Sequence, residues 1–191
     1  MYFPAFYLEK ITGLINQGNF LYHWTTVANS KEIIKDKFIY SKATLFGLDP
    51  QKNIPILRQY PDLRTDTENG FIDYVFLGNT NWIAVGHKSY YGQVGFEINP
   101  IDLLNKTEFF VFPFNTGRYY QTTSKEFKFS DLTTLKEALG KKTKNYEVLV
   151  KGKIEITGNT INRIICDDSN IEDLRRALSN NKLNSIPIEE Y

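Results

Sequence analysis

The chain has 191 residues, and its 23 lysines and arginines nearly balance 22 acids, for a formal charge of +1. This balance excludes a strong overall field that would draw the protein to nucleic acid or to a membrane, so an anionic partner must bind a local patch. No apolar run approaches the roughly 20 residues that span a bilayer. The length fits one domain over 1–191. The one cysteine, Cys166, excludes an internal disulfide and favours the cytoplasm.

The first half of the chain predicts short elements joined by one long loop. A helix over 6–16 leads into a strand over 21–25, and Asn29 with Glu32 forms a capping-box pattern that begins a second helix. A strand follows over 38–41. The proline-containing stretch 47–70 predicts a long loop, which in a compact domain is often functional.

The second half is predicted to be richer in strands. Ser130 begins one helix, and a capping box of Ser169 and Glu172 begins the last one. Because strands outnumber helices and do not alternate with them, the predicted fold class is α+β and not doubly wound α/β. The predicted strands cover 71–77, 81–85, 93–98, 109–112, 146–156 and 161–166.

Two polar residues interrupt apolar runs that have the character of strands. His23 stands in Leu-Tyr-His-Trp-Thr, and Glu147 stands in Asn-Tyr-Glu-Val-Leu-Val. Alternation at period two sends Tyr22 and Trp24 to one face of the strand and His23 and Thr25 to the other. A carboxylate buried without a partner in such a run would be costly. We therefore predict that His23 and Glu147 are site residues that face one cleft.

Several kinds of chemistry are excluded by what the sequence lacks. The two histidines, His23 and His87, have no neighbours at metal-ligand spacing, so no metal is expected. Cys166 has no histidine near it in sequence, and there is no Gly-x-Ser-x-Gly motif. The Gly-Gln-Val-Gly stretch lacks the strand, turn and helix order of a phosphate-binding loop. A mechanism with a single carboxylate remains, in which Glu147 either stabilises an oxocarbenium-like centre or holds a sugar hydroxyl while a glycosidic bond breaks.

Four short motifs occur in a fixed order along the chain, and this order is informative about the fold. His-x-Thr comes first, then Phe-Ile-Tyr-Ser after a capped helix, then Tyr-Glu-Val-Leu-Val-Lys-Gly-Lys-Ile, and finally Ile-Asn-Arg-Ile-Ile. This order resembles the ADP-ribosyltransferase fold and, within it, the DarT-type DNA ADP-ribosyltransferase toxins. The resemblance implies a split β-sheet clasp with flanking short helices, NAD as co-substrate and Glu147 as the catalytic residue.

The resemblance also implies how NAD is held. His23 would contact the adenosine-side ribose, and Thr25 or the backbone beside it would contact the nicotinamide end. Tyr74 or Phe76 would stack on nicotinamide. Arg58 or Arg64, in the loop before that strand, would act with Glu147 in catalysis. The residues implied to bind NAD are His23, Trp24, Thr25, Tyr40, Ser41, Tyr74 and Phe76.

The acceptor is predicted from residues close to Glu147. Transferases that modify arginine usually have a glutamate two positions earlier, where this chain has Asn145, so arginine is a poor candidate. The lysines around Glu147 suit a phosphate backbone, and aromatic residues beside Arg118 suit stacking on unpaired bases. The predicted acceptor contacts are Arg118, Tyr119, Tyr120, Lys142, Lys144 and Asn145.

The residues and the resemblance together predict an NAD-dependent ADP-ribosyltransferase that modifies a base of single-stranded DNA or RNA. Use as a toxin or anti-phage effector is implied by the resemblance alone. The resemblance implies a macrodomain-type antitoxin as partner. The stretch 78–82 is shorter than its counterpart in toxins that modify thymidine, so the identity of the base stays open. Two alternatives also stay open: an enzyme that modifies a protein side chain, and an inactive binding module of the same fold.

Overall fold

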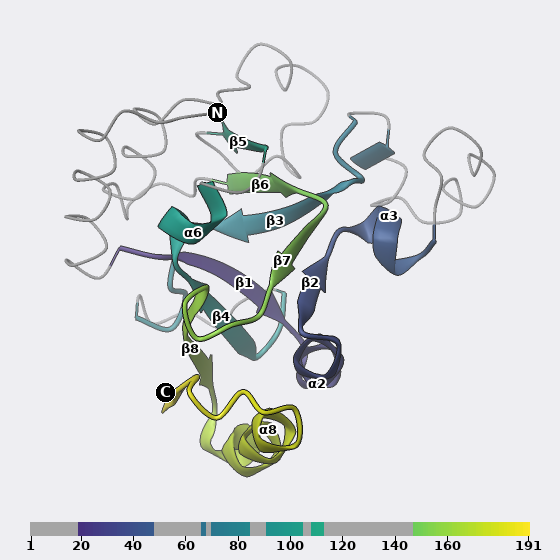
Figure 1. The fold of residues 1–191 in the computed structure, drawn as a ribbon. Helices are drawn as coiled ribbons and strands as arrows, with labels where there is room; N and C mark the ends of the chain where they lie inside the picture. Colours follow the sequence, from purple (N-terminus) through teal and green to yellow (C-terminus); the bar gives the residue numbers. More distant parts are fainter. Residues whose placement is uncertain (1–18, 48–65, 68–69, 85–90, 105–107, 113–146) are drawn as a thin grey trace.

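The computed structural model describes residues 19–47, 66–67, 70–84, 91–104, 108–112 and 147–191. The helices predicted over 6–16 and 130–139, and most of the predicted 47–70 loop, lie outside these residues. Within them the fold is mixed α+β, as predicted, with a large sheet, a small sheet and four short helices (Figure 1). The helices are α2 (Val27–Asp36), α3 (Lys42–Leu45), α6 (Pro100–Leu104) and α8 (Asp168–Asn180).

The large sheet has seven strands in the described part of the chain, in the order β5-β6-β3-β1-β4-β8-β9. All neighbouring strands are antiparallel except β8 and β9, which are parallel. The small sheet pairs β2 (Phe38–Tyr40) with β7 (Lys153–Glu155). The strands of the large sheet are β1 (Leu21–Thr25), β3 (Tyr74–Gly78), β4 (Val94–Ile98), β5 (Phe109–Phe112), β6 (Glu147–Lys151), β8 (Ile161–Cys166) and β9 (Ile188–Glu190).

The large sheet is split between β1 and β3. All five residues of β1 are in register with β4, but β1 meets β3 at one pair, Tyr22 with Gly78. From that pair the two strands diverge (Figure 1). We call the space between the separating strands the split. It divides the sheet into one half that carries His23 and another that carries Glu147.

The two faces of the large sheet are covered differently. One face carries the main core, in which Leu21, Leu77, Phe96 and Val148 are fully buried or nearly so. The other face carries two smaller clusters. One joins Phe71, Tyr74 and Leu149, while the second joins Tyr22, Trp24 and Ile165 with the partly buried Phe20, Trp82 and Ile83. The first cluster lies on the side of β3 and β6, while the second packs side chains of β1 and β8 against the turn after β3 and so crosses the split.

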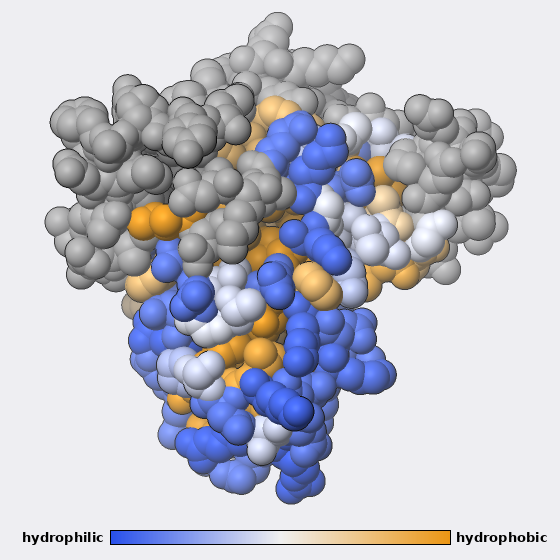
Figure 2. All heavy atoms as spheres, in the orientation of Figure 1, coloured by the Kyte–Doolittle hydropathy of each residue, from blue (hydrophilic) through white to orange (hydrophobic). Residues whose placement is uncertain are grey.

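Helix α8 covers the C-terminal edge of the core with one face. Its buried side chains are Ile171, Leu174 and Leu178, at the spacing of a single helical stripe. The end of the molecule that carries α8 is largely hydrophilic on its outer surface (Figure 2). This helix therefore contributes to packing and not to the sheet face that holds Glu147.

Several boundaries differ from the predictions because side chains bond to nearby backbone. Helix α2 begins earlier than the capping box, since Thr26 Oγ1 accepts from the backbone N of Asn29 at 3.2 Å. The strand predicted over 81–85 is a turn over the described residues 82–84, because Asn81 Oδ1 accepts from the backbone N of Ile83 and Ala84, each at 3.2 Å.

Two other elements also depart from the predicted boundaries. The predicted strand 146–156 is broken at Gly152, whose φ of +78° ends β6 and begins β7. The last helix begins at Asp168, with Asp167 as its N-cap residue, and not at the capping box of Ser169 and Glu172. Ser169 Oγ instead donates a hydrogen bond to Asp167 Oδ1 at 2.8 Å.

Candidate functional site

Glu147 is the first residue of β6 and lies half-buried beside the split. Its cross-strand partner on β3 is Gly78, and the partner of Gly78 on β1 is Tyr22. Because cross-strand partners share a face of the sheet, Glu147 and Tyr22 lie on the same face with Gly78 between them. A Cβ added at Gly78 would meet no atom closer than 3.9 Å. The cross-strand row formed by Glu147, Gly78 and Tyr22 therefore places the Glu147 carboxylate next to a glycine, which has no side chain.

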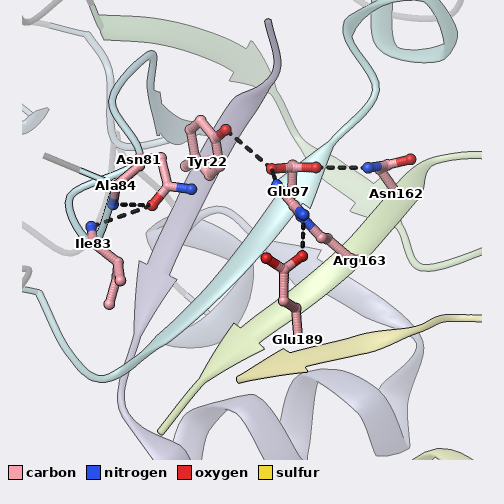
Figure 3. Close-up of polar contacts among 8 residues, drawn as sticks. All are labelled: Tyr22, Asn81, Ile83, Ala84, Glu97, Asn162, Arg163 and Glu189. Carbon is pink, nitrogen blue, oxygen red and sulfur yellow. Dashed lines mark hydrogen bonds and ion pairs between the residues drawn. The ribbon is translucent and has the colours of Figure 1, made fainter. Parts of the chain in front are cut away.

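The same row continues through the other half of the sheet. Tyr22 pairs with Glu97 on β4, and Glu97 pairs with Arg163 on β8. The Glu97 side chain is completely buried, and it accepts from Tyr22 Oη at 3.0 Å and from Arg163 Nη2 at 2.9 Å (Figure 3). Asn162 Nδ2 donates to its other oxygen at 2.6 Å. We call Tyr22, Glu97, Asn162 and Arg163 the Glu97 network.

The sequence analysis did not single out the Glu97 network, although it contained a usable signal. Glu97 stands in Val-Gly-Phe-Glu-Ile, which is an acid in an apolar strand just as Glu147 is. The pattern is the same, but its meaning depends on register. Only the pairing of β1, β4 and β8 brings Tyr22 and Arg163 to this carboxylate.

His23 starts from the opposite face of the sheet. Alternation along β1 separates it from Tyr22, and its partner Phe96 belongs to the main core. Yet its Nδ1 lies 3.2 Å from the Phe76 carbonyl oxygen on β3, so the imidazole ring reaches across the split. His23 and Glu147 therefore start from opposite faces of the sheet, and the expectation that they face one cleft stays a prediction. Both nevertheless border the split, since Phe76 lies two residues from Gly78, the partner of Glu147.

The protonation state of His23 follows from its surroundings. Burial lowers the pKa of His23, and the bond to the Phe76 backbone opposes this shift. A carbonyl oxygen can only accept, so Nδ1 must carry the hydrogen and donate. Because its pKa is lowered, the ring is neutral at neutral pH, and Nε2 therefore has a lone pair. His23 can thus accept a hydrogen bond from a ligand hydroxyl.

Trp24 and Thr25 have packing contacts that the sequence analysis did not foresee. Trp24 Nε1 donates to the Thr80 carbonyl at 3.3 Å, which is a second contact across the split. Its ring lies against Gly95, where an added Cβ would come within 2.8 Å of the ring. The Thr25 side chain is buried at the end of β1.

The remaining predicted NAD contacts in the described residues also have structural partners. Ser41 is the N-cap of α3, where its Oγ accepts from the backbone N of Thr44 at 3.3 Å. Tyr74 Oη donates to Glu108 at 2.8 Å. Phe76 shares the face of Gly78 and Glu147, and Lys42 Nζ lies 5.5 Å from its ring centroid.

The half-buried Tyr40 lies opposite Lys153 in the small sheet, and its ring packs on Phe38. The lysines after Glu147 contact neighbouring residues. Lys151 forms an ion pair with Glu108 at 3.3 Å, and Lys153 Nζ lies 3.8 Å from the Phe38 ring centroid. The other predicted catalytic and acceptor residues lie outside the described residues. They are Arg58, Arg64, Arg118, Tyr119, Tyr120, Lys142, Lys144 and Asn145.

Other kinds of site find little support in the described part of the chain. Cys166 is buried in the main core, and burial raises the pKa of its thiol to about 11, so it stays a protonated packing residue. No group of three or more metal-ligating side chains occurs among the described residues. Among the helices described, none is long and apolar enough to cross a membrane.

The split sheet, with Glu147 at the start of β6 beside the edge strand β5, has the fold of DarT-type proteins. The fold is that of DarT from Thermus sp. 2.9 over 90% of this chain. The complex with carba-NAD+ matches with a TM-score of 0.57 at 14% identity, covering 94% of that chain. The complex with ADP-ribosylated ssDNA matches at 0.59 and 13%, covering 93%. The complex with NAD+ matches at 0.54 and 14%, covering 96%.

No family model and no curated protein sequence matches this chain. At this level of identity the likeness to Thermus sp. 2.9 DarT concerns the fold.

Proposed function

We propose that this protein is an NAD-dependent ADP-ribosyltransferase that transfers ADP-ribose to a base of single-stranded DNA or RNA. The observation that carries the proposal is the place of Glu147, half-buried at the start of β6 beside Gly78 and the split. Support comes from the shared fold, because the Thermus protein was solved in complex with NAD+ and with ADP-ribosylated ssDNA.

In this proposal NAD lies across the split with its nicotinamide ribose at Glu147. The bond between nicotinamide and the ribose C1′ breaks, and nicotinamide leaves as a neutral molecule with the bonding electrons. The Glu147 carboxylate stabilises the positive charge that develops on the ribose ring. An acceptor atom of the base then bonds to C1′ and releases its proton to water. His23 Nε2 accepts from a hydroxyl of the adenosine-side ribose.

The wider proposal places the enzyme in the cytoplasm as one domain over 1–191, acting as a toxin or anti-phage effector. Its free activity would damage the host, so a neutralising partner such as a macrodomain that removes ADP-ribose is expected. Arg58 or Arg64 would contact NAD and act with Glu147 in catalysis. Arg118, Tyr119, Tyr120, Lys142, Lys144 and Asn145 would contact the acceptor.

Labelled NAD tests both the reaction and its acceptor. The label, on the adenylate phosphate, is incubated with the protein and with separate pools of single-stranded DNA, single-stranded RNA and protein. We expect nucleic acid to become labelled. Label confined to the protein pool would contradict the choice of acceptor, and no nicotinamide release in any pool would contradict the reaction.

Glu147→Gln is the matched variant for the catalytic role. It keeps the size of the side chain and removes the charge that stabilises the ribose cation, so we expect kcat to fall by roughly 100-fold or more. NAD affinity, measured by calorimetry, should change little. Full activity in Glu147→Gln would show that this carboxylate is not catalytic, and a cellular effect that persists without transfer would indicate a binding module.

A further inference from the structure

The two halves of the sheet are held together at the split by three consecutive residues of β1. Tyr22 is in backbone register with Gly78, His23 Nδ1 donates to the Phe76 carbonyl, and Trp24 Nε1 donates to the Thr80 carbonyl at 3.3 Å. The side chain of Asn81, in the turn that follows β3, lies near the Tyr22 hydroxyl. Each contact joins β1 to β3 or to that turn.

Of these three residues, Tyr22 is the one whose side chain is hydrogen-bonded to a buried charged group, the Glu97 carboxylate. Its hydroxyl donates to Glu97, whose side chain is 0% exposed, at 3.0 Å. Burial and then the nearby Glu97 carboxylate raise the pKa of Tyr22, so the hydroxyl keeps its proton and remains a donor. Arg163 holds Glu97 in turn and forms a second ion pair with Glu189 on β9 (Figure 3). The position of Tyr22 is thereby tied to β4 and β8, and the Glu189 pair at the exposed edge adds little.

We infer that the Glu97 network sets the relative position of the two halves of the sheet, which makes Tyr22 and Glu97 positioning residues for the proposed reaction. The inference rests on the proposed function for its catalytic consequence. NAD that lies across the split must contact the half with His23 and the half with Glu147 at once. A small change at the Tyr22 and Gly78 pair therefore misaligns the nicotinamide ribose with Glu147.

The two tryptophans of the chain supply a readout that does not depend on activity. Trp24 lies on β1 and Trp82 lies in the turn after β3, and both belong to the cluster that contains Tyr22. They stand on the two sides of the split. Trp24 also stacks on the Tyr22 ring, so their fluorescence emission responds to the geometry of this junction and to the side chain at position 22.

Tyr22→Phe is the main variant, because it removes one hydroxyl and leaves the Glu97 and Arg163 ion pair in place. We expect a change in tryptophan emission and a fall in kcat/KM for NAD of about ten-fold, the size of effect that one lost buried hydrogen bond gives. Measuring kcat and KM separately shows whether alignment or binding is lost. If Tyr22→Phe does not fold, Asn162→Ala removes another hydrogen bond to Glu97, leaves the Arg163 ion pair in place and should change the emission in the same way.

Glu189→Gln is the control. It removes the exposed partner of Arg163 and leaves Glu97 paired, so emission and kcat/KM should stay at wild-type values. Unchanged emission and kcat/KM in folded Tyr22→Phe would overturn the inference. If the wild type itself transfers no ADP-ribose, the proposed function fails. The emission of Tyr22→Phe then decides the inference alone, with an unchanged spectrum overturning it.

Discussion

His23 shows how one side chain can serve both the fold and the proposed site. Its Nδ1 is used by the Phe76 carbonyl, which ties β1 to β3 where the strands separate. Its Nε2 keeps a lone pair because burial lowers the pKa and the ring stays neutral at neutral pH. An imidazolium could only donate, so the neutral ring suits a partner that offers a hydroxyl hydrogen.

The lowered pKa of His23 predicts a pH dependence of stability. As the pH falls below about 6.5, the ordinary histidine pKa, His23 becomes protonated in the unfolded chain but stays unprotonated in the folded protein. The free energy of unfolding should therefore decrease from about pH 6.5 down to the lowered folded pKa and level off below it. Urea unfolding across this range measures the slope.

His23→Asn is the control for that measurement, because asparagine can still donate to the Phe76 carbonyl but does not titrate. The variant should have a shallower dependence than the wild type. Identical slopes in the two proteins would mean that another group, and not His23, binds the proton.

At the scale of elements, the end of β1 depends on a glycine in the segment before β4. Gly92 has a φ of +143°, and a Cβ there would lie 2.0 Å from the Thr25 carbonyl oxygen. Gly92→Ala should therefore lower the free energy of unfolding by at least about 2 kcal/mol. Gly47 has a φ of +58° with no atom within 4 Å of an added Cβ, so Gly47→Ala should cost only about 1 kcal/mol. Equal losses in thermal unfolding would contradict this account of Gly92.

The elements that the sequence predicts well are those in which the pattern and the packing agree. The runs around His23 and Glu147 alternate at period two, and both are strands of the large sheet. The segment from Asn81 to Val85 was also predicted as a strand from its apolar residues. The Asn81 side chain instead bonds to the backbone ahead of it and makes a turn, which is a local competition that hydrophobic pattern does not reveal.

The site is harder to predict than the elements because it depends on pairing between distant strands. Glu97 and Glu147 look alike in sequence, yet Glu97 is enclosed by Tyr22, Asn162 and Arg163 while Glu147 lies beside Gly78. Likewise, alternation correctly separates His23 from Tyr22, but it does not show that the imidazole ring enters the split. Register between strands supplies this information, and one residue of slippage would reverse every face.

At the scale of the whole molecule, the fold is shared with a protein of only 13–14% sequence identity. The motifs that predict this fold lie toward the two ends of the chain, in the runs around His23 and Glu147. Function is a matter of the site and not of the fold, so the reaction must be tested on Glu147 and its neighbours.

A crystal structure of the protein with NAD bound tests the central claim most directly. The account predicts that NAD crosses the split, with the nicotinamide ribose beside Glu147 and a hydroxyl of the adenosine-side ribose within hydrogen-bond distance of His23 Nε2. The result that would contradict it is NAD bound away from the split, or bound there with Glu147 out of reach of either hydroxyl and of C1′ of the nicotinamide ribose.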